Sequence, residues 1–168
     1  PLGLALSPDE RRLYVTQRAD NDVAVVDLDS MAVVARIPVG DDPHQVLTDP
    51  QGRFLFVAEM GINTLSVIDL AGLGQTRRLR TGMAPFGLAL SPDGSLLYVS
   101  HQLSNPGPCR TPPVLELTVV DVNRQSVSQR RDLHNTVIGQ GVAVTPDGRF
   151  VATAVEVPRN LIPETQVY

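Results

Sequence analysis

Three histidines are the residues of this sequence best suited to hold a metal ion or to contact a redox group. They are His44, His101 and His134, which lie 57 and 33 residues apart. Neutral imidazole is a common metal ligand, but local metal motifs place their ligands only a few residues apart. We therefore predict no metal site. We expect His44 to pack where a strand begins, His101 to hydrogen-bond to the loop that follows it, and His134 to be solvated.

Two acidic segments and one cysteine also carry ligating or reactive groups. Residues 18–22 (RADND) and 39–43 (VGDDP) supply carboxylates, but they lack the glycine and the distal glutamate of a calcium-binding EF-hand loop. Cys109 lies beside Arg110 without a nucleophile motif around it. A single cysteine excludes an internal disulfide and any CxxCH haem-attachment motif within these residues. No catalytic residue and no cofactor are predicted for this stretch.

All 14 basic residues are arginines, and some of them cluster in two segments. Arg77, Arg78 and Arg80 lie in TRRLRTG, and Arg130 and Arg131 lie in QRRD. Charges on outer strands usually prevent edge-to-edge pairing of sheets. Aromatic residues make up only 4% of the chain, and the net charge is -4, so base stacking and phosphate attraction are both weak. We expect a solvated rim and no nucleic-acid partner.

The composition is that of a globular protein, with 42% apolar and 19% charged residues. No apolar run is long enough to span a membrane, and no signal peptide is recognisable. The chain begins with Pro1, inside a repeat and without a methionine. We therefore expect it to be an excerpt of a longer protein.

One sequence motif occurs in four similar copies along the chain. The copies are SPDERRLYVTQ from Ser7, DPQGRFLFVAE from Asp49, SPDGSLLYVSH from Ser91 and TPDGRFVATAV from Thr145. Their prolines are separated by 42, 42 and 54 residues, and a proline-rich insertion at 103–113 supplies most of the extra length. A period near 42 with short apolar runs and turn signals is typical of a β-propeller blade.

Each unit reads as four strands, named here a, b, c and d. In the first unit they cover residues 3–7, 12–17, 22–28 and 33–39, all rich in β-branched or aromatic side chains. The Pro-Asp-Gly step predicts the turn between a and b, because glycine there can take a positive φ. Asp27, Asp69 and Asp121 close strand c, where a carboxylate can accept hydrogen bonds from turn amides. Short connections make the four strands an antiparallel meander.

One such sheet is too small to fold alone, so the units must pack against each other. Strand a supports this, because GLALS, VLTD, GLALS and GVAVT lack polar alternation, as in sheets covered on both faces. We predict one partial all-β propeller domain over residues 1–168, with about 3.5 four-stranded antiparallel blades. The predicted blades are 1–42, 43–84, 85–138 (with the insertion 103–113) and the start of a fourth at 139–168.

Three segments carry a family resemblance. Tyr14-Val15-Thr16, Phe56-Val57-Ala58 and Tyr98-Val99-Ser100 each follow a Pro-Asp or Pro-Gln turn and resemble the YVTN-type β-propeller repeat. The fourth copy departs from it, with Ala152-Thr153-Ala154. The resemblance implies a seven-bladed propeller. Some bacterial proteins of this type, similar down to a tail like PRNLIPETQ, continue into a di-haem cytochrome c peroxidase-like domain, which implies that haem c could bind downstream of these residues.

The meander predicts which connections share a face. The b–c and d–a connections lie on one face of each blade, and the Pro-Asp-Gly turns lie on the other. Loops on a rigid scaffold commonly present binding groups, and function is expected where equivalent positions of the repeats differ. The candidate binding-face residues are His44, Glu59, Phe86, His101, Arg110 and His134.

Three functions fit these observations. The favoured one is a noncatalytic scaffold that binds a protein or a small ligand through this face, located in the periplasm or outside the cell, as the resemblance implies. The second is the propeller portion of an extracytoplasmic redox enzyme whose haem c domains lie outside these residues. The third is a lactonase-like hydrolase, for which the sequence offers no acid, base and ligand constellation.

Overall fold

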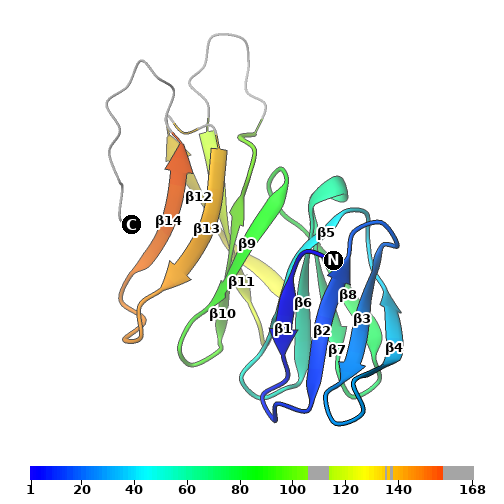
Figure 1. The fold of residues 1–168 in the computed structure, drawn as a ribbon. Helices are drawn as coiled ribbons and strands as arrows, with labels where there is room; N and C mark the ends of the chain where they lie inside the picture. Colours follow the sequence, from blue (N-terminus) through cyan, green and yellow to red (C-terminus); the bar gives the residue numbers. More distant parts are fainter. Residues whose placement is uncertain (106–113, 135, 137, 157–168) are drawn as a thin grey trace. The chain divides into compact units, whose positions relative to one another are not determined.

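The computed structural model describes residues 1–105, 114–134, 136 and 138–156, which form β-strands and one short 3-10 helix (Figure 1). The remaining residues include most of the predicted insertion 103–113, with Cys109 and Arg110, so these predictions lie outside the described part. The chain divides into two compact units, Pro1–Arg80 and Thr81–Tyr168. Each unit is described on its own.

The first unit contains two four-stranded antiparallel sheets. One has the order β1-β2-β3-β4 and the other the order β5-β6-β7-β8. The first sheet consists of β1 (Leu4–Leu6), β2 (Arg12–Gln17), β3 (Asp22–Asp27) and β4 (Ala32–Pro38). The second consists of β5 (Pro43–Thr48), β6 (Phe54–Glu59), β7 (Thr64–Asp69) and β8 (Gly74–Arg80), with the helix η1 (Met60–Ile62) between β6 and β7.

The second unit contains a four-stranded sheet, β9-β10-β11-β12, and a two-stranded sheet, β13-β14. The strands are β9 (Pro85–Leu90), β10 (Leu96–His101), β11 (Val114–Asp121), β12 (Ser126–His134), β13 (Ile138–Val144) and β14 (Val151–Glu156). All pairings are antiparallel between consecutive strands, as the meander prediction requires.

The predicted turn chemistry is confirmed at both ends of the sheets. Gly94 has a φ of 70° in its Pro-Asp-Gly turn, whereas Glu10 holds the same turn position in the first repeat with a φ of 57°. Asp27, Asp69 and Asp121 each accept a hydrogen bond at Oδ1 from a turn amide, at 2.8, 2.9 and 2.9 Å. These bonds form between strands c and d, where the short turn leaves amides without ladder partners.

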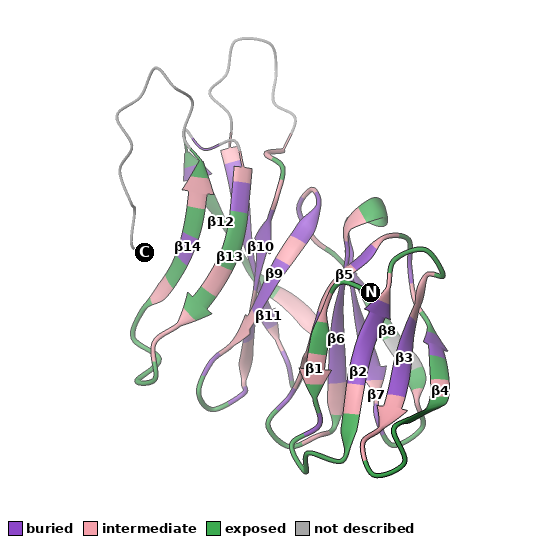
Figure 2. Cartoon of the chain, in the orientation of Figure 1, coloured by how far each residue is buried: buried purple, intermediate pink, exposed green. Residues whose placement is uncertain are grey.

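In each unit, consecutive sheets pack face to face through strand a of the later sheet. β5 lies against β1 and β2, and β13 lies against β9 and β10. The core of the first unit combines residues of both its sheets: Tyr14, Val23, Val25, Ile37, Val46, Leu55, Val57, Ile68 and Leu70. Figure 2 shows that buried residues gather on the middle strands β2, β3, β6 and β7, while β4 is largely exposed.

A hydroxyl on strand b joins adjacent sheets within each unit. Thr16 Oγ1 donates to the carbonyl oxygen of His44 at 2.8 Å and accepts from the amide of Gly3 at 2.7 Å. Ser100 Oγ donates in the same way to the carbonyl oxygen of Gln140 at 3.1 Å and accepts from the amide of Gly87 at 3.1 Å. Each hydroxyl therefore satisfies backbone groups of two neighbouring strands a.

Within the described residues, strand a of the first and of the last sheet is not covered on both faces. Leu4 on β1 is 63% exposed, and β13 alternates between exposed and half-buried positions over much of its length. Within its unit, β1 packs against β5 of one neighbouring sheet, and β13 packs against β9 and β10 of another.

Candidate functional site

The structure describes five of the six predicted binding-face residues and places them in different environments. His44 on β5 and Phe86 on β9 are half-buried, and His134 at the end of β12 is exposed. Glu59 ends β6 and His101 ends β10, and both side chains are fully buried. The two buried residues each belong to a polar network, one in each unit.

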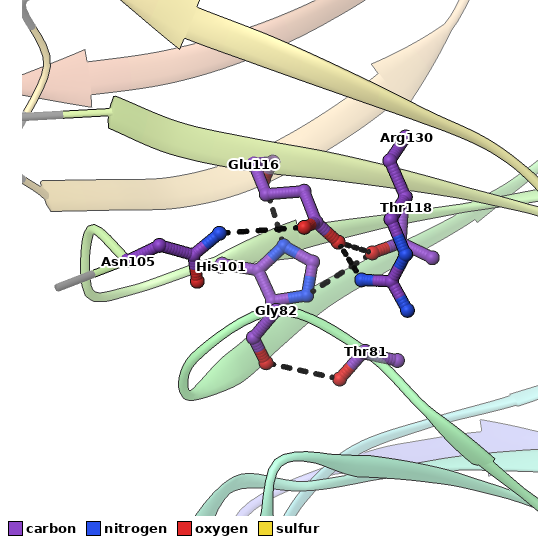
Figure 3. Close-up of polar contacts among 7 residues, drawn as sticks. All are labelled: Thr81, Gly82, His101, Asn105, Glu116, Thr118 and Arg130. Carbon is purple, nitrogen blue, oxygen red and sulfur yellow. Dashed lines mark hydrogen bonds and ion pairs between the residues drawn. The ribbon is translucent and has the colours of Figure 1, made fainter. Parts of the chain in front are cut away.

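In the second unit the network centres on Glu116 of β11 (Figure 3). One carboxylate oxygen, Oε1, accepts from Thr118 Oγ1 at 2.5 Å and from Arg130 Nη1 at 2.5 Å. The other, Oε2, accepts from Asn105 Nδ2 at 3.4 Å. Because Glu116 is only 5% exposed, these donors replace the water that a buried carboxylate would otherwise need.

The imidazole of His101 lies beside this carboxylate (Figure 3). Nδ1 lies 2.7 Å from the backbone carbonyl oxygen of Glu116, and Nε2 lies 3.4 Å from Thr118 Oγ1. A carbonyl oxygen only accepts hydrogen bonds, so Nδ1 carries the proton and donates it. Burial lowers the pKa of His101, although its bond to the Glu116 carbonyl and the Glu116 charge oppose the shift. The ring is therefore neutral near pH 7, with a lone pair on Nε2.

Gly82 packs directly on the imidazole and on Glu116. A Cβ at this position would lie 3.1 Å from His101 Cδ2 and 3.1 Å from Glu116 Cβ. Thr81 Oγ1 donates to the carbonyl oxygen of Gly82 at 3.1 Å. A side chain at residue 82 would crowd the ring, so glycine lets the segment before β9 close over His101.

In the first unit the network centres on Glu59. Its carboxylate accepts from Thr64 Oγ1 at 2.5 Å, from Ser66 Oγ at 2.5 Å and from Arg78 Nε at 2.9 Å. The backbone amide of Gly40 donates to it at 2.6 Å. Gly40 corresponds to Gly82 by the 42-residue period, and a Cβ there would lie 2.7 Å from Glu59 Oε2.

The two networks are variants of one arrangement. Arg36, Arg78 and Arg130 occupy equivalent positions on strand d, with the same spacings of 42 and 52 residues as the aspartates of strand c. Each arginine pairs with an acid of its own sheet, Asp22, Glu59 and Glu116 respectively, and Arg36 also lies 3.8 Å from a carboxylate oxygen of Asp20. The acid comes from the end of strand b in the second sheet and from the start of strand c in the other two.

These pairs overturn one prediction. Arg78 and Arg130 were expected to be solvated rim charges, but each binds a buried carboxylate while its own side chain stays 39% or 42% exposed. The signal that identifies them is the common spacing of the three strand d arginines. Glu116, Thr118 and Arg130 were not among the predicted site residues, and among the described residues His101 bonds to β11 and not to the loop that follows it.

Each network combines a buried carboxylate with a half-exposed arginine. Both carboxylates already hold several donors, and the His101 ring is enclosed. In the part of the chain that the structure describes, no group of three or more His, Cys, Asp or Glu residues could hold a metal ion. Each network fixes a half-exposed guanidinium, and a group that is oriented in advance binds a ligand with a smaller loss of entropy.

Comparison with known proteins identifies the architecture. The family model "Lactonase, 7-bladed beta-propeller" matches residues 3–79 and 39–160. No curated protein matches the chain. Among solved structures, a chain of Kuenenia stuttgartiensis hydrazine synthase has 28% sequence identity and a TM-score of 0.84. The match covers 96% of this chain and 45% of that one, so this chain spans less than half of its structural relative.

The predicted fold class is confirmed by the sheets and the family model together. The described residues form three four-stranded antiparallel sheets and one two-stranded sheet, which correspond to a partial β-propeller of about 3.5 blades. No helix in the described residues has the length and apolar character needed to cross a membrane.

Proposed function

Because the chain belongs to the seven-bladed β-propeller family of the Lactonase model, we propose that it is part of a noncatalytic binding scaffold. The scaffold holds a protein or a small ligand on the face that carries the b–c and d–a connections. The observation that supports this proposal is the recurrent pair of a buried acid and a half-exposed arginine, Glu59 with Arg78 and Glu116 with Arg130. A buried charge network is costly to build, and here it orients a guanidinium at the surface.

Exposed apolar side chains on the same connections favour a protein ligand. Ile62, in the b–c connection of the second sheet, is 40% exposed, and Leu103, in that of the third sheet, is 46% exposed. Arginine is enriched at the energetic centres of protein interfaces, and burial of exposed apolar surface drives most protein association. Each unit thus presents an oriented arginine and an apolar contact on this face.

Site-specific photocrosslinking tests the proposal. A photoreactive phenylalanine derivative replaces Ile62 or Leu103 in the full chain inside its native cells. Glu10 and Gly148 serve as controls on the turn face, which is the opposite face and carries the a–b and c–d turns. We expect a discrete adduct from the first two positions and none from the controls. Adducts of equal yield from both faces, or none from Ile62 and Leu103, would contradict the proposal.

A lactonase-like hydrolase is the alternative favoured by the family model. That model is named for lactonases, but its match extends over the strands of the repeat and so supports the activity only weakly. A hydrolysis assay tests this alternative. The purified full chain is incubated with γ-butyrolactone or δ-valerolactone, and the protons released are titrated at constant pH. Lactone hydrolysis that is lost when the protein is unfolded would favour the hydrolase over the noncatalytic binding scaffold.

The propeller part of a larger extracytoplasmic enzyme is the second alternative. The match to 45% of a hydrazine synthase chain favours a propeller within a longer enzyme. The YVTN-type repeats suggest one such arrangement, in which a di-haem cytochrome c peroxidase-like domain follows. A haem stain and a Soret absorption band of the full chain test it, and cell fractionation tests the proposed periplasmic or extracellular location.

A further inference from the structure

A polar cavity opens on the turn face of the first unit, away from the b–c and d–a connections. It has a volume of about 550 Å³ and is lined by the a–b and c–d turns of the first sheet and by the a–b turn of the second. Ligand pockets commonly range from about 300 to about 1,000 Å³. Its charged lining consists of Asp9, Arg11, Arg12, Asp27 and Asp29.

Two polar residues of the cavity lining differ in type from the residues at the same positions of the other repeats. Arg12 stands where the other three repeats have an apolar residue, namely Phe54, Leu96 and Phe150. Gln51 stands where the other three have the turn aspartate, namely Asp9, Asp93 and Asp147. The fold requires neither change, because the other copies form the same turns without them.

The cavity presents charges of both signs. In the described part of the chain, Arg11, Arg12 and Asp29 form no ion pair within 4 Å. Asp27 Oδ1 accepts from the amide and the hydroxyl of Ser30 at 2.8 and 2.7 Å, and these bonds lower the Asp27 pKa. The carboxylate therefore stays ionised near neutral pH, opposite Arg12 in the strand register.

We propose that this cavity binds a zwitterionic ligand of the amino-acid or short-peptide class. The ligand carboxylate pairs with the guanidinium groups of Arg11 and Arg12, which match carboxylate geometry in a bidentate manner. The ligand ammonium lies toward Asp27 and Asp29, and the Gln51 amide can donate or accept beside either end. A ligand of one sign would meet like charges in the cavity.

Calorimetric titration of the full chain with triglycine tests this proposal. We expect binding to triglycine, and binding at least about tenfold weaker to N-acetyltriglycine and to triglycine amide, because each lacks one charge-assisted contact. Equal affinity for triglycine and either blocked peptide, or no heat from triglycine at about 10 mM, would overturn the proposal.

Two variants borrow residues from the third repeat, which folds with them. Arg12→Leu copies Leu96 and Asp29→Asn copies Asn123, and each should weaken triglycine binding at least about tenfold. Arg149→Ser is the matched control, because Arg149 occupies the position of Arg11 in the fourth repeat and lies outside the cavity. Unchanged binding in Arg12→Leu would exclude this site. Crosslinking from Ile62 should be the same in Arg12→Leu, Asp29→Asn and Arg149→Ser. The peptide-binding proposal can therefore fail without affecting the proposed contact on the face that carries the b–c and d–a connections.

Discussion

The carboxylate of Glu59 is fully buried, yet it accepts hydrogen bonds from Gly40, Thr64, Ser66 and Arg78. An ionised group in a protein interior is tolerated only when it is paired and hydrogen-bonded. Glu59 meets both conditions because strand β7, a d–a connection and an arginine of β8 all supply donors to it. Its contribution to stability therefore depends on the whole set of partners.

Replacing Glu59 by alanine should lower the free energy of unfolding by about 3–5 kcal/mol, because the buried donors then have no acceptor. Glu59→Gln should cost less, since the amide oxygen still accepts from some of them. Urea unfolding followed by circular dichroism measures both. Asp20→Asn is the control, because Asp20 is largely exposed, and its effect should stay within about 0.5 kcal/mol. A Glu59→Ala protein as stable as this control would refute the account.

His101 should make stability depend on pH below neutrality. Burial lowers its pKa from 6.5 in the folded state, so the unfolded chain takes up a proton first as the pH falls. The free energy of unfolding should therefore decrease from about pH 6.5 downward, until the pH reaches the lower folded pKa.

Urea unfolding at about pH 7.5 and about pH 5.5 measures this decrease. The variant His101→Gln, which copies Gln17 of the first repeat, should reduce it. Burial lowers the pKa of His44 as well, so His44→Asn should remove a further part. An identical pH dependence in wild type and His101→Gln would show that the imidazole is not buried in solution.

At the scale of the element, the turn between strands a and b shows how closely sequence predicts local structure. Residues 12–17 were predicted as a strand, and β2 covers those same residues. The predicted positive φ is present at Gly52, Gly94 and Gly148. Such features are predictable because they depend on a few neighbouring residues and on the steric limits of φ and ψ.

Gly94→Ala should lower the free energy of unfolding by about 1 kcal/mol, because an L-residue pays a steric cost at φ 70°. In the opposite direction, Glu10→Gly relieves the same strain at φ 57° and should leave stability unchanged or raise it by up to about 1 kcal/mol. Thermal unfolding of both variants beside wild type gives the comparison. A loss in Glu10→Gly larger than that in Gly94→Ala would reverse the expected order.

At the scale of the whole molecule, the sheets are units that need neighbours. β1 exposes Leu4 even though its sequence has no polar alternation. The family model describes a seven-bladed propeller, in which every blade packs between two others. We therefore predict that a further blade covers the exposed face of β1 in a closed propeller.

Leu4→Ala in the full-length protein should lower the free energy of unfolding by about 2–5 kcal/mol, because a covering blade would bury Leu4. Met31→Ala is the control, because Met31 is an exposed apolar residue beside strand β4, and its effect should stay within about 0.5 kcal/mol. Chemical unfolding of the full chain measures both. If Leu4→Ala lowers the free energy of unfolding by no more than Met31→Ala does, no blade covers β1.

The sequence alone was sufficient to predict the repeat, the strands, the turns and the propeller class, because all of these depend on local patterns that recur with a fixed period. It did not show which acid pairs with each strand d arginine. Residues 17 and 22, or 59 and 64, face each other across a hairpin, so either partner can bring a carboxylate to the same guanidinium. In the third sheet the longer connection separates His101 from Glu116 by 15 residues. Only the folded register decides that they touch, because contact across strands depends on hydrogen-bond pairing and not on distance along the chain.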